Sequence, residues 1–313
     1  TIYLLLLTLT TPPETMAPFR QGSCIPQLFL LVLAFCLNTC PTSGLISPTW
    51  TSSAKHALEH LTSPPPLKVT PLEDLANTRI PGPAGSGVDI LAYVAKPKSS
   101  NQNNRKALPV IILIHEFFGL NPSIVGKAEG LAEDLGCVVV APDTFRGVST
   151  DFIPQAIWLA LSTPQDRVND DLDAVCTYIE SSQLAATGGG IDKLAIMGFC
   201  YGGGKAMRYS TQRREDAATV VFYGMPVTDV AELQRLRAPV CGVFGRNDRQ
   251  FSMKLLDEFK QALDKANIEN DVRIYEGVGH AFWSDMAQVR RGEEPQTKAY
   301  RQCTDFLRRF FSD

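Results

Sequence analysis

One cysteine of this chain stands where a nucleophile would stand. Cys200 is the centre of the motif Gly-Phe-Cys-Tyr-Gly (residues 198–202), which directly follows the apolar run of residues 194–197. A strand, a sharp turn and a helix in this order form a nucleophile elbow, here with a thiol in place of the usual hydroxyl. The amides and dipole of a helix N-terminus favour the thiolate. The pattern predicts a reactive thiolate, and a buried structural cysteine beside a glycine turn is the alternative.

An aspartate and a histidine follow this cysteine in the order that the catalytic triad of an α/β-hydrolase requires. His280 is the only histidine after Cys200, and it lies in a glycine-containing loop after the strand-like residues 271–275. Asp248 follows the apolar residues 239–245, 48 residues after Cys200 and 32 before His280. Each interval has room for a helix and a strand. An aspartate after a strand is usually a turn former or a helix cap, and a single histidine is usually a structural residue. Together with Cys200, in this order, they predict a catalytic triad.

Apolar runs alternate with amphipathic segments through most of the chain. Strands are expected at residues 88–95, 109–114, 137–141, 194–199, 218–223, 239–244 and 272–275. Helices are expected at residues 124–135, 168–179, 255–266 and 300–310. Continuous apolar strands between amphipathic helices predict a three-layer α/β fold, with a mostly parallel central sheet and helices on both faces. Sites in such sheets lie at the carboxyl ends of the strands, where Cys200, Asp248, His280 and Glu116 all fall.

Composition excludes several classes of function. The 313 residues are 44% hydrophobic with a net charge of −3, and no basic block supports nucleic-acid binding. The eight cysteines show neither metal-ligand spacing nor a Cys-x-x-Cys pair, and Cys137, Cys176 and Cys241 lie in apolar patterns typical of core residues. The pair His115 and Glu116 lacks the second histidine of His-Glu-x-x-His, so we expect no metal and no cofactor.

Residues 1–65 differ from the rest and are expected to be a targeting segment and linker, ahead of a catalytic domain at residues 66–313. Residues 28–37 form an apolar core after Arg20, and small residues at 42–44 provide a cleavage region, as in a secretory signal. The Ser/Thr-rich residues 49–63 resemble the transit part of a two-part plastid signal, or an ordinary linker. We expect secretion or a plastid location, with no membrane span in the mature domain. A membrane anchor is the alternative, and a cytosolic location would follow if this N-terminus is a gene-model artefact.

Four motifs give the chain a family resemblance. They are Ile-His-Glu-Phe-Phe-Gly-Leu-Asn (114–121), Gly-Phe-Cys-Tyr-Gly-Gly (198–203), Asn-Asp (247–248) and Gly-His-Ala-Phe (279–282). From about residue 88 to the C-terminus the chain resembles the dienelactone hydrolase (carboxymethylenebutenolidase) family of α/β-hydrolases. The resemblance implies Cys200 as nucleophile, His280 as base and Asp248 as its orienting partner. Glu116 matches a glutamate that, in the family, is thought to contact the cysteine and assist thiolate formation.

The residues themselves support two further assignments. Glu116 follows an apolar strand, so its carboxylate is expected to be partly desolvated and a better proton acceptor. A solvated turn residue is the alternative. The oxyanion hole is expected to consist of the backbone N–H groups of Tyr201 and Phe117. Removing one such donor typically costs about 3–4 kcal/mol of transition-state stabilisation.

The chain departs from the family at the arginines that help to anchor a substrate carboxylate in the bacterial enzymes. Residues 281–285 contain no arginine, although Arg146 and Arg249 are candidates to replace it. Trp283, Trp158 and Phe118 fit either an apolar pocket or the core.

We therefore expect a monomeric cysteine hydrolase of small-molecule esters, lactones or thioesters that forms a thioester acyl-enzyme. The alternatives are a hydrolase-fold protein that binds a ligand or partner without turnover, and a redox protein. Loss of one triad residue would favour the binding protein, but none of the three is missing. A redox protein would need a resolving cysteine near Cys200, and only Cys241 is a candidate.

Overall fold

The computed structural model describes residues 70–98, 108–182, 184 and 191–312. The described residues belong to one compact unit within Ser63–Asp313. The predicted signal and linker, residues 1–65, lie outside the described residues and stay predictions. No helix within the described ranges is both long and apolar enough to cross a membrane.

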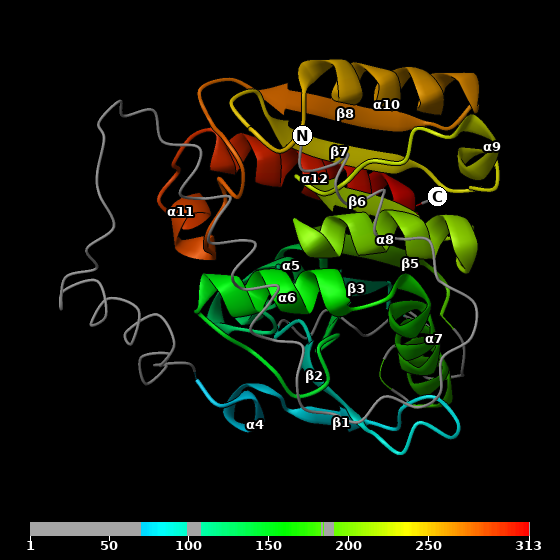
Figure 1. Ribbon diagram of the computed structural model, residues 1–313, viewed down its shortest axis with the longest axis vertical. Coiled ribbons are helices and arrows are strands. Elements are labelled where there is room, and N and C mark those ends of the chain that lie inside the picture. Colours follow the sequence, from blue (N-terminus) through cyan, green and yellow to red (C-terminus); the bar gives the residue numbers. More distant parts are fainter. Residues whose placement is uncertain (1–69, 99–107, 183, 185–190, 313) are drawn as a thin grey trace, which may run out of the picture. The chain divides into compact units, whose positions relative to one another are not determined.

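The centre of the described unit is one eight-stranded sheet in the order β1-β2-β4-β3-β5-β6-β7-β8 (Figure 1). The strands are β1 (Thr78–Ile80), β2 (Ile90–Ala95), β3 (Val110–Ile114), β4 (Val138–Pro142), β5 (Leu194–Phe199), β6 (Ala218–Phe222), β7 (Val240–Gly245) and β8 (Asn270–Tyr275). Strand β2 pairs antiparallel with both β1 and β4, and the other neighbours are parallel. The predicted mostly parallel sheet is confirmed.

Helices cover both faces of this sheet. They are α4 (Leu72–Leu75), α5 (Pro122–Leu135), α6 (Ile153–Ser162), α7 (Gln165–Ser181), α8 (Tyr201–Gln212), α9 (Val230–Leu233), α10 (Met253–Lys265), α11 (Met286–Arg290) and α12 (Gln296–Ser312). Helices α7, α8 and α10 pack on one face, and α5, α11 and α12 pack on the other (Figure 1). The three layers predicted from the sequence are present.

Strand β3 shows why the strands of this sheet are continuous apolar runs in the sequence. Ile111 and Leu113 contact the core shared with α5 and α12, whereas Ile112 and Ile114 contact the core shared with α7 and α8. All four side chains are fully buried. Successive residues of a strand point to opposite faces, so a strand covered on both faces needs an apolar residue at every position.

The structure adds elements that the sequence pattern did not predict, chiefly β1 and α6. Helix α6 has Pro154 in its first turn and contains no charged residue, so it has no amphipathic pattern from which to predict it. Its surface carries four exposed apolar side chains: Ile153, Ile157, Trp158 and Leu161. Trp158 is therefore a surface residue, whereas Trp283 is fully buried in the core.

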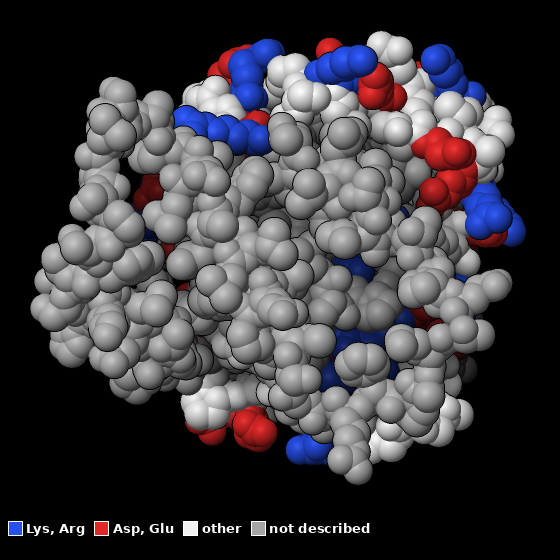
Figure 2. Space-filling view, in the orientation of Figure 1, with Lys and Arg blue, Asp and Glu red and all other residues white. Residues whose placement is uncertain are grey.

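Charged side chains of the two signs are interspersed on the surface. Figure 2 shows Lys and Arg beside Asp and Glu along the edge formed by α10 and β8. This mixture accords with the small net charge of −3.

Candidate active site

Cys200 occupies the sharp turn between β5 and α8, as the motif predicts. Its backbone has φ 53° and ψ −114°, a left-handed conformation that is unfavourable for a residue with a Cβ atom. The turn is fixed on both sides. The Cys200 N–H donates to the carbonyl of Phe222 at 2.9 Å, and the Cys200 carbonyl accepts from Gly203 and Gly204 at 3.1 and 3.2 Å.

Glycine is required at the start of α8 because two backbones approach each other there. A Cβ atom added to Gly202 would lie 2.3 Å from the Ile114 carbonyl oxygen and 2.5 Å from that of His115. A real Cβ atom essentially never comes so close, so only glycine lets α8 contact the end of β3. This approach brings the first turn of α8 against the segment that continues into Phe117.

Cys200, His280 and Asp248 form one chain of hydrogen bonds. His280 Nε2 lies 2.9 Å from Cys200 Sγ, and His280 Nδ1 lies 2.7 Å from Asp248 Oδ2. The other carboxylate oxygen of Asp248 accepts the N–H of Gln250 at 2.8 Å. The Asp248 side chain is fully buried and that of His280 is 18% exposed. Three residues that are far apart in the sequence thus meet at the carboxyl ends of β5, β7 and β8.

The partners of His280 determine its charge. Burial alone would lower the pKa of His280, but its hydrogen bonds to Asp248 and Cys200, together with their negative charges, raise that pKa to about 10. At neutral pH the arrangement therefore favours an imidazolium, which stabilises a thiolate beside it.

Tyr223 lies between this triad and a second group of polar residues. Its ring packs edge-on against the His280 ring, with centroids 5.3 Å apart. Its hydroxyl donates to the Trp283 carbonyl at 3.2 Å and lies 3.5 Å from Glu116 Oε1. Burial raises the pKa of Tyr223 well above its usual value, and the charges of Glu116 and Cys200 raise it further. Tyr223 therefore stays a neutral hydroxyl that donates hydrogen bonds.

Glu116 is a mostly buried residue at the end of β3 rather than a solvated turn residue. Its side chain is 15% exposed, and Oε1 lies 3.5 Å from Lys127 Nζ as well as from the Tyr223 hydroxyl. Among the described residues, no hydrogen bond joins Glu116 to Cys200. The predicted fourth residue thus lies beside the triad and contacts it through Tyr223.

Lys127 is a residue of this site that the sequence reading missed. It is fully buried on α5, where its ammonium lies 3.1 Å from Ser123 Oγ and 4.5 Å from the centroid of the Phe199 ring. The available signal was its position. Lys127 falls on the predicted apolar face of the helix, between Ile124 and Ala128, where a charge needs a partner.

His115 supports the site without taking part in it. The ring is fully buried, and Nε2 accepts the Thr144 N–H at 3.1 Å, so that nitrogen carries no proton. Nδ1 therefore donates to the Glu116 carbonyl at 2.6 Å and fixes the backbone of that residue. Within the described ranges, no group of three His, Cys, Asp or Glu residues is arranged to hold a metal ion.

The two arginines considered as substitute anchors differ in their surroundings. Arg146 donates to both carboxylate oxygens of Asp171, at 2.6 and 3.2 Å, so its charge is already matched. Arg249 is exposed on the loop that follows β7. The structure thus makes Arg146 a poor candidate for a substrate anchor.

The other predicted core cysteines are buried and free. Cys137, Cys176 and Cys241 all lie inside the fold, whereas Cys200 is partly exposed. Burial raises the pKa of Cys137 to about 12 and that of Cys241 well above its usual value. Burial thus disfavours the thiolate at these positions, and Cys200 is the accessible thiol among the cysteines of the described residues.

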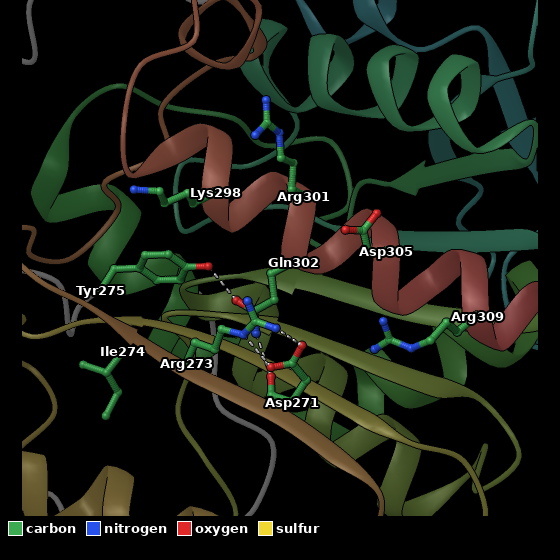
Figure 3. Close-up of a pocket in the computed structure, with 9 residues that line it drawn as sticks. All are labelled: Asp271, Arg273, Ile274, Tyr275, Lys298, Arg301, Gln302, Asp305 and Arg309. Atoms are coloured by element: carbon green, nitrogen blue, oxygen red, sulfur yellow. Dashed lines mark hydrogen bonds and ion pairs between the residues drawn. The ribbon is translucent and has the colours of Figure 1, made fainter.

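A separate cavity of about 380 Å³ lies between β8 and α12 (Figure 3). Arg273 donates to both carboxylate oxygens of Asp271 at 2.8 and 2.9 Å, and Gln302 accepts from Tyr275 and donates to the Asp271 carbonyl. The polar groups of these four residues thus bond to one another, and no triad residue lines the cavity.

Comparisons with known proteins show the family to which the chain belongs. The model of the dienelactone hydrolase family matches residues 90–311. A protein of Salmonella typhimurium assigned as a carboxymethylenebutenolidase is 32% identical over 213 residues, covering 64% of this chain and 75% of that protein. A Methylorubrum extorquens protein with the same assignment is 30% identical over 242 residues, covering 73% of this chain and 79% of its own.

A solved structure extends the likeness to the fold. The crystal structure of a Klebsiella pneumoniae protein assigned as a dienelactone hydrolase has a TM-score of 0.61 and 26% sequence identity. The match covers 75% of this chain and 97% of that one. This chain belongs to the dienelactone hydrolase family, with an α/β-hydrolase fold, and is a hydrolase that acts on ester bonds.

Proposed function

We propose that the protein is a cysteine-dependent hydrolase of small esters, lactones or thioesters, with Cys200 as nucleophile, His280 as base and Asp248 as its orienting partner. The observation that carries the proposal is the continuous contact from Cys200 Sγ through the His280 ring to Asp248, at 2.9 and 2.7 Å. A base must lie within hydrogen-bond reach of the proton that it takes, and His280 does.

In the acylation half of the reaction, His280 Nε2 takes the thiol proton and the sulfur of Cys200 bonds to the substrate carbonyl carbon. The carbonyl electrons move onto oxygen to give a tetrahedral oxyanion. When that intermediate collapses, the C–O bond to the alcohol breaks, and His280 returns its proton to the leaving oxygen. The product is a thioester on Cys200 and a free alcohol.

In the second half, water hydrolyses this thioester. Acylation removes the Cys200 charge that helps to raise the His280 pKa, so more of the imidazole is neutral at a given pH and able to take a proton from water. His280 takes a proton from water as the hydroxide oxygen bonds to the acyl carbon. The C–S bond then breaks, which regenerates the thiolate and releases the acid. A thiolate leaves more readily than an amine, which favours esters over peptides.

The oxyanion hole is proposed to use the backbone N–H groups of Tyr201 and Phe117. Tyr201 begins α8, and Phe117 follows the end of β3 that α8 contacts through Gly202. Within the described part of the chain, neither N–H has a backbone acceptor. A donor without an acceptor at a helix N-terminus is suited to a developing negative charge.

The N-terminal segment, with its apolar residues 28–37 and the Ser/Thr-rich residues 49–63, is proposed to direct the enzyme into the secretory pathway or to a plastid. Sequencing the N-terminus of the mature protein from its native cells tests this. A mature chain that starts after residue 40 supports processing, and one that retains residues 16–40 opposes it.

The decisive test of the enzymatic proposal compares p-nitrophenyl acetate hydrolysis by the wild-type chain, Cys200→Ala and Cys176→Ala. We expect activity in the wild type and in Cys176→Ala, whose thiol lies buried on α7. Cys200→Ala should be inactive, and iodoacetamide should label Cys200 first as activity disappears. Full activity after Cys200 is alkylated would remove it as the nucleophile.

A further inference from the structure

Helix α6 carries a stripe of exposed apolar side chains, which we call the α6 stripe. Its four members are between 42% and 66% exposed: Ile153, Ile157, Trp158 and Leu161. Their spacing along the helix places them on one side of it, opposite the side that carries its buried residues. Single exposed apolar residues are ordinary, but a contiguous group of them marks a surface that meets an apolar partner.

The α6 stripe offers such a partner almost no hydrogen-bonding group. Helix α6 contains no charged residue, and the indole N–H of Trp158 is the one polar group on the four side chains. Interfaces between proteins usually combine apolar residues with a polar rim that forms direct hydrogen bonds. Aliphatic side chains beside a tryptophan instead suit the boundary between the headgroups and acyl chains of a lipid bilayer.

Three cations adjoin the C-terminal end of the stripe and form what we call the basic corner. Lys205 on α8 donates to the Thr163 carbonyl, directly after α6, at 2.8 Å. Arg167 on α7 donates to the Thr163 hydroxyl at 3.0 Å, and the exposed Arg208 lies one helical turn after Lys205. Within the described part of the chain, the ion pairs around this corner involve other arginines and leave these three cations without a carboxylate partner.

The cations of the basic corner repel one another. Burial, together with the positive charges of Arg208 and Arg167, lowers the pKa of Lys205 to about 8. Lys205 therefore remains mainly protonated at neutral pH. Asp166, in the first turn of α7, offsets only part of the positive charge. Anionic lipid headgroups would complement the remainder, because a negatively charged membrane surface attracts nearby Lys and Arg side chains.

We propose that the α6 stripe and the basic corner dock on the surface of an anionic lipid bilayer. The apolar side chains of α6 enter the boundary between headgroups and acyl chains, while Lys205 and Arg208 contact lipid phosphates. Helices α6 and α8 lie next to each other in Figure 1, and the bond from Lys205 to Thr163 joins them. This interaction goes beyond the proposed hydrolase activity and does not depend on it.

The first test measures flotation of the full-length chain with vesicles of phosphatidylcholine, alone or mixed with phosphatidylglycerol. The wild type should bind the mixed vesicles more tightly than the neutral ones. Ile157→Ser with Leu161→Ser should weaken binding to the mixed vesicles by about tenfold or more, because two apolar side chains are lost from the contact. Val88→Ser is the matched control, since Val88 is 41% exposed but lies outside α6, and it should bind like the wild type.

A second pair of variants tests the charge. Lys205→Gln with Arg208→Gln should weaken binding to the mixed vesicles by about fivefold for each cation removed, and should leave binding to neutral vesicles unchanged. Lys260→Gln, which removes an exposed cation from α10, should bind like the wild type. Added salt should weaken binding of the wild type to the mixed vesicles, since it screens the attraction.

Tryptophan quenching assigns the contact to α6, since the apolar residues 28–37 are a second candidate for a lipid contact. Lipids with brominated acyl chains quench a tryptophan that enters the bilayer. Quenching should be clear in the wild type and largely lost in Trp158→Phe, because Trp283 is fully buried. Trp50→Phe should retain the quenching.

The contrary outcomes are equally specific. Equal binding by the wild type and the Ile157→Ser, Leu161→Ser double variant would overturn the proposal, as would quenching that survives in Trp158→Phe and disappears in Trp50→Phe. A dimer in analytical ultracentrifugation that the double variant abolishes would also overturn it, since the stripe would then join two copies of the chain. If the double variant fails to fold by circular dichroism, Leu161→Ser alone decides the question. No readout here uses hydrolysis, so failure of the enzymatic proposal would leave these results unchanged.

Discussion

At the scale of single residues, the two ring nitrogens of His280 contact two groups with opposite hydrogen-bonding requirements. Cys200 needs a proton acceptor at Nε2, and Asp248 needs a donor at Nδ1. Both contacts favour the protonated ring once the thiolate has formed, which is why the pKa of His280 rises to about 10 despite burial. In the proposed mechanism the imidazole moves the proton, and the carboxylate orients the ring and stabilises its charge.

This division of work predicts unequal losses on substitution. His280→Ala should lower kcat/KM for p-nitrophenyl acetate by about 10³-fold, since it removes the group that transfers the proton. Asp248→Asn should cost clearly less, because the ring remains while only its orientation and charge stabilisation suffer. Steady-state kinetics on the two purified variants, with folding checked by circular dichroism, measure both losses. A larger loss in Asp248→Asn would show that the orientation of the ring limits the rate.

At the scale of elements, the site depends on how closely α8 approaches the sheet. The helix starts where the backbones of β3, β5 and the segment after β6 converge. Two further glycines pack as closely as Gly202 does. A Cβ atom added to Gly198 would lie 2.1 Å from the Gly202 carbonyl oxygen, and one added to Gly224 would lie 2.5 Å from the Gly203 backbone. The strained Cys200 turn is thus held by close backbone packing on several sides.

A pair of glycine substitutions tests this packing. Gly202→Ala must displace α8 from the end of β3, so it should lower the free energy of unfolding by about 1–3 kcal/mol and reduce esterase activity. Gly126→Ala is the matched control, because a Cβ there meets nothing within 4 Å inside α5. It should stabilise the protein by roughly 1 kcal/mol and leave activity intact. Urea unfolding measures both, and equal effects would contradict the packing argument.

At the scale of the whole molecule, the surroundings of the site bear on which substrates enter. A desolvated substrate carboxylate needs a cation close by. Residues 281–285 supply none, Arg146 is paired with Asp171, and Lys127 is buried against Glu116. The charges of Arg146 and Lys127 are thus matched by carboxylates already.

We therefore predict that neutral aryl or alkyl esters are hydrolysed at higher kcat/KM than the negatively charged dienelactone. Measuring both substrates on the same preparation tests the prediction. A clear preference for dienelactone would contradict it, and the exposed Arg249 would then be the first anchor to examine. Arg249→Ala should in that case reduce kcat/KM for dienelactone while leaving that for p-nitrophenyl acetate unchanged.

The sequence alone determined the fold class and the position of Cys200 in the turn between a strand and a helix, for local physical reasons. Strand β5 was predicted at its observed bounds because a buried strand, a glycine-flanked turn and a helix leave a strong pattern in a few adjacent residues. The order of Cys200, Asp248 and His280 along parallel strands already placed them at one edge of the sheet. Helix α6 escaped prediction because its apolar residues line an exposed surface, which defeats a reading based on burial.

Only the tertiary structure decided how these residues contact one another and what surrounds them. The sequence offered Glu116 as a partner of Cys200, yet its carboxylate contacts Lys127 and Tyr223, which come from α5 and from the end of β6. A charged residue on an apolar helix face indicates that the charge has a partner, but not which residue that partner is. Residues on different elements share no local sequence pattern. Their distances depend on how α5, β3 and β6 pack against one another, and that packing depends on many side chains at once.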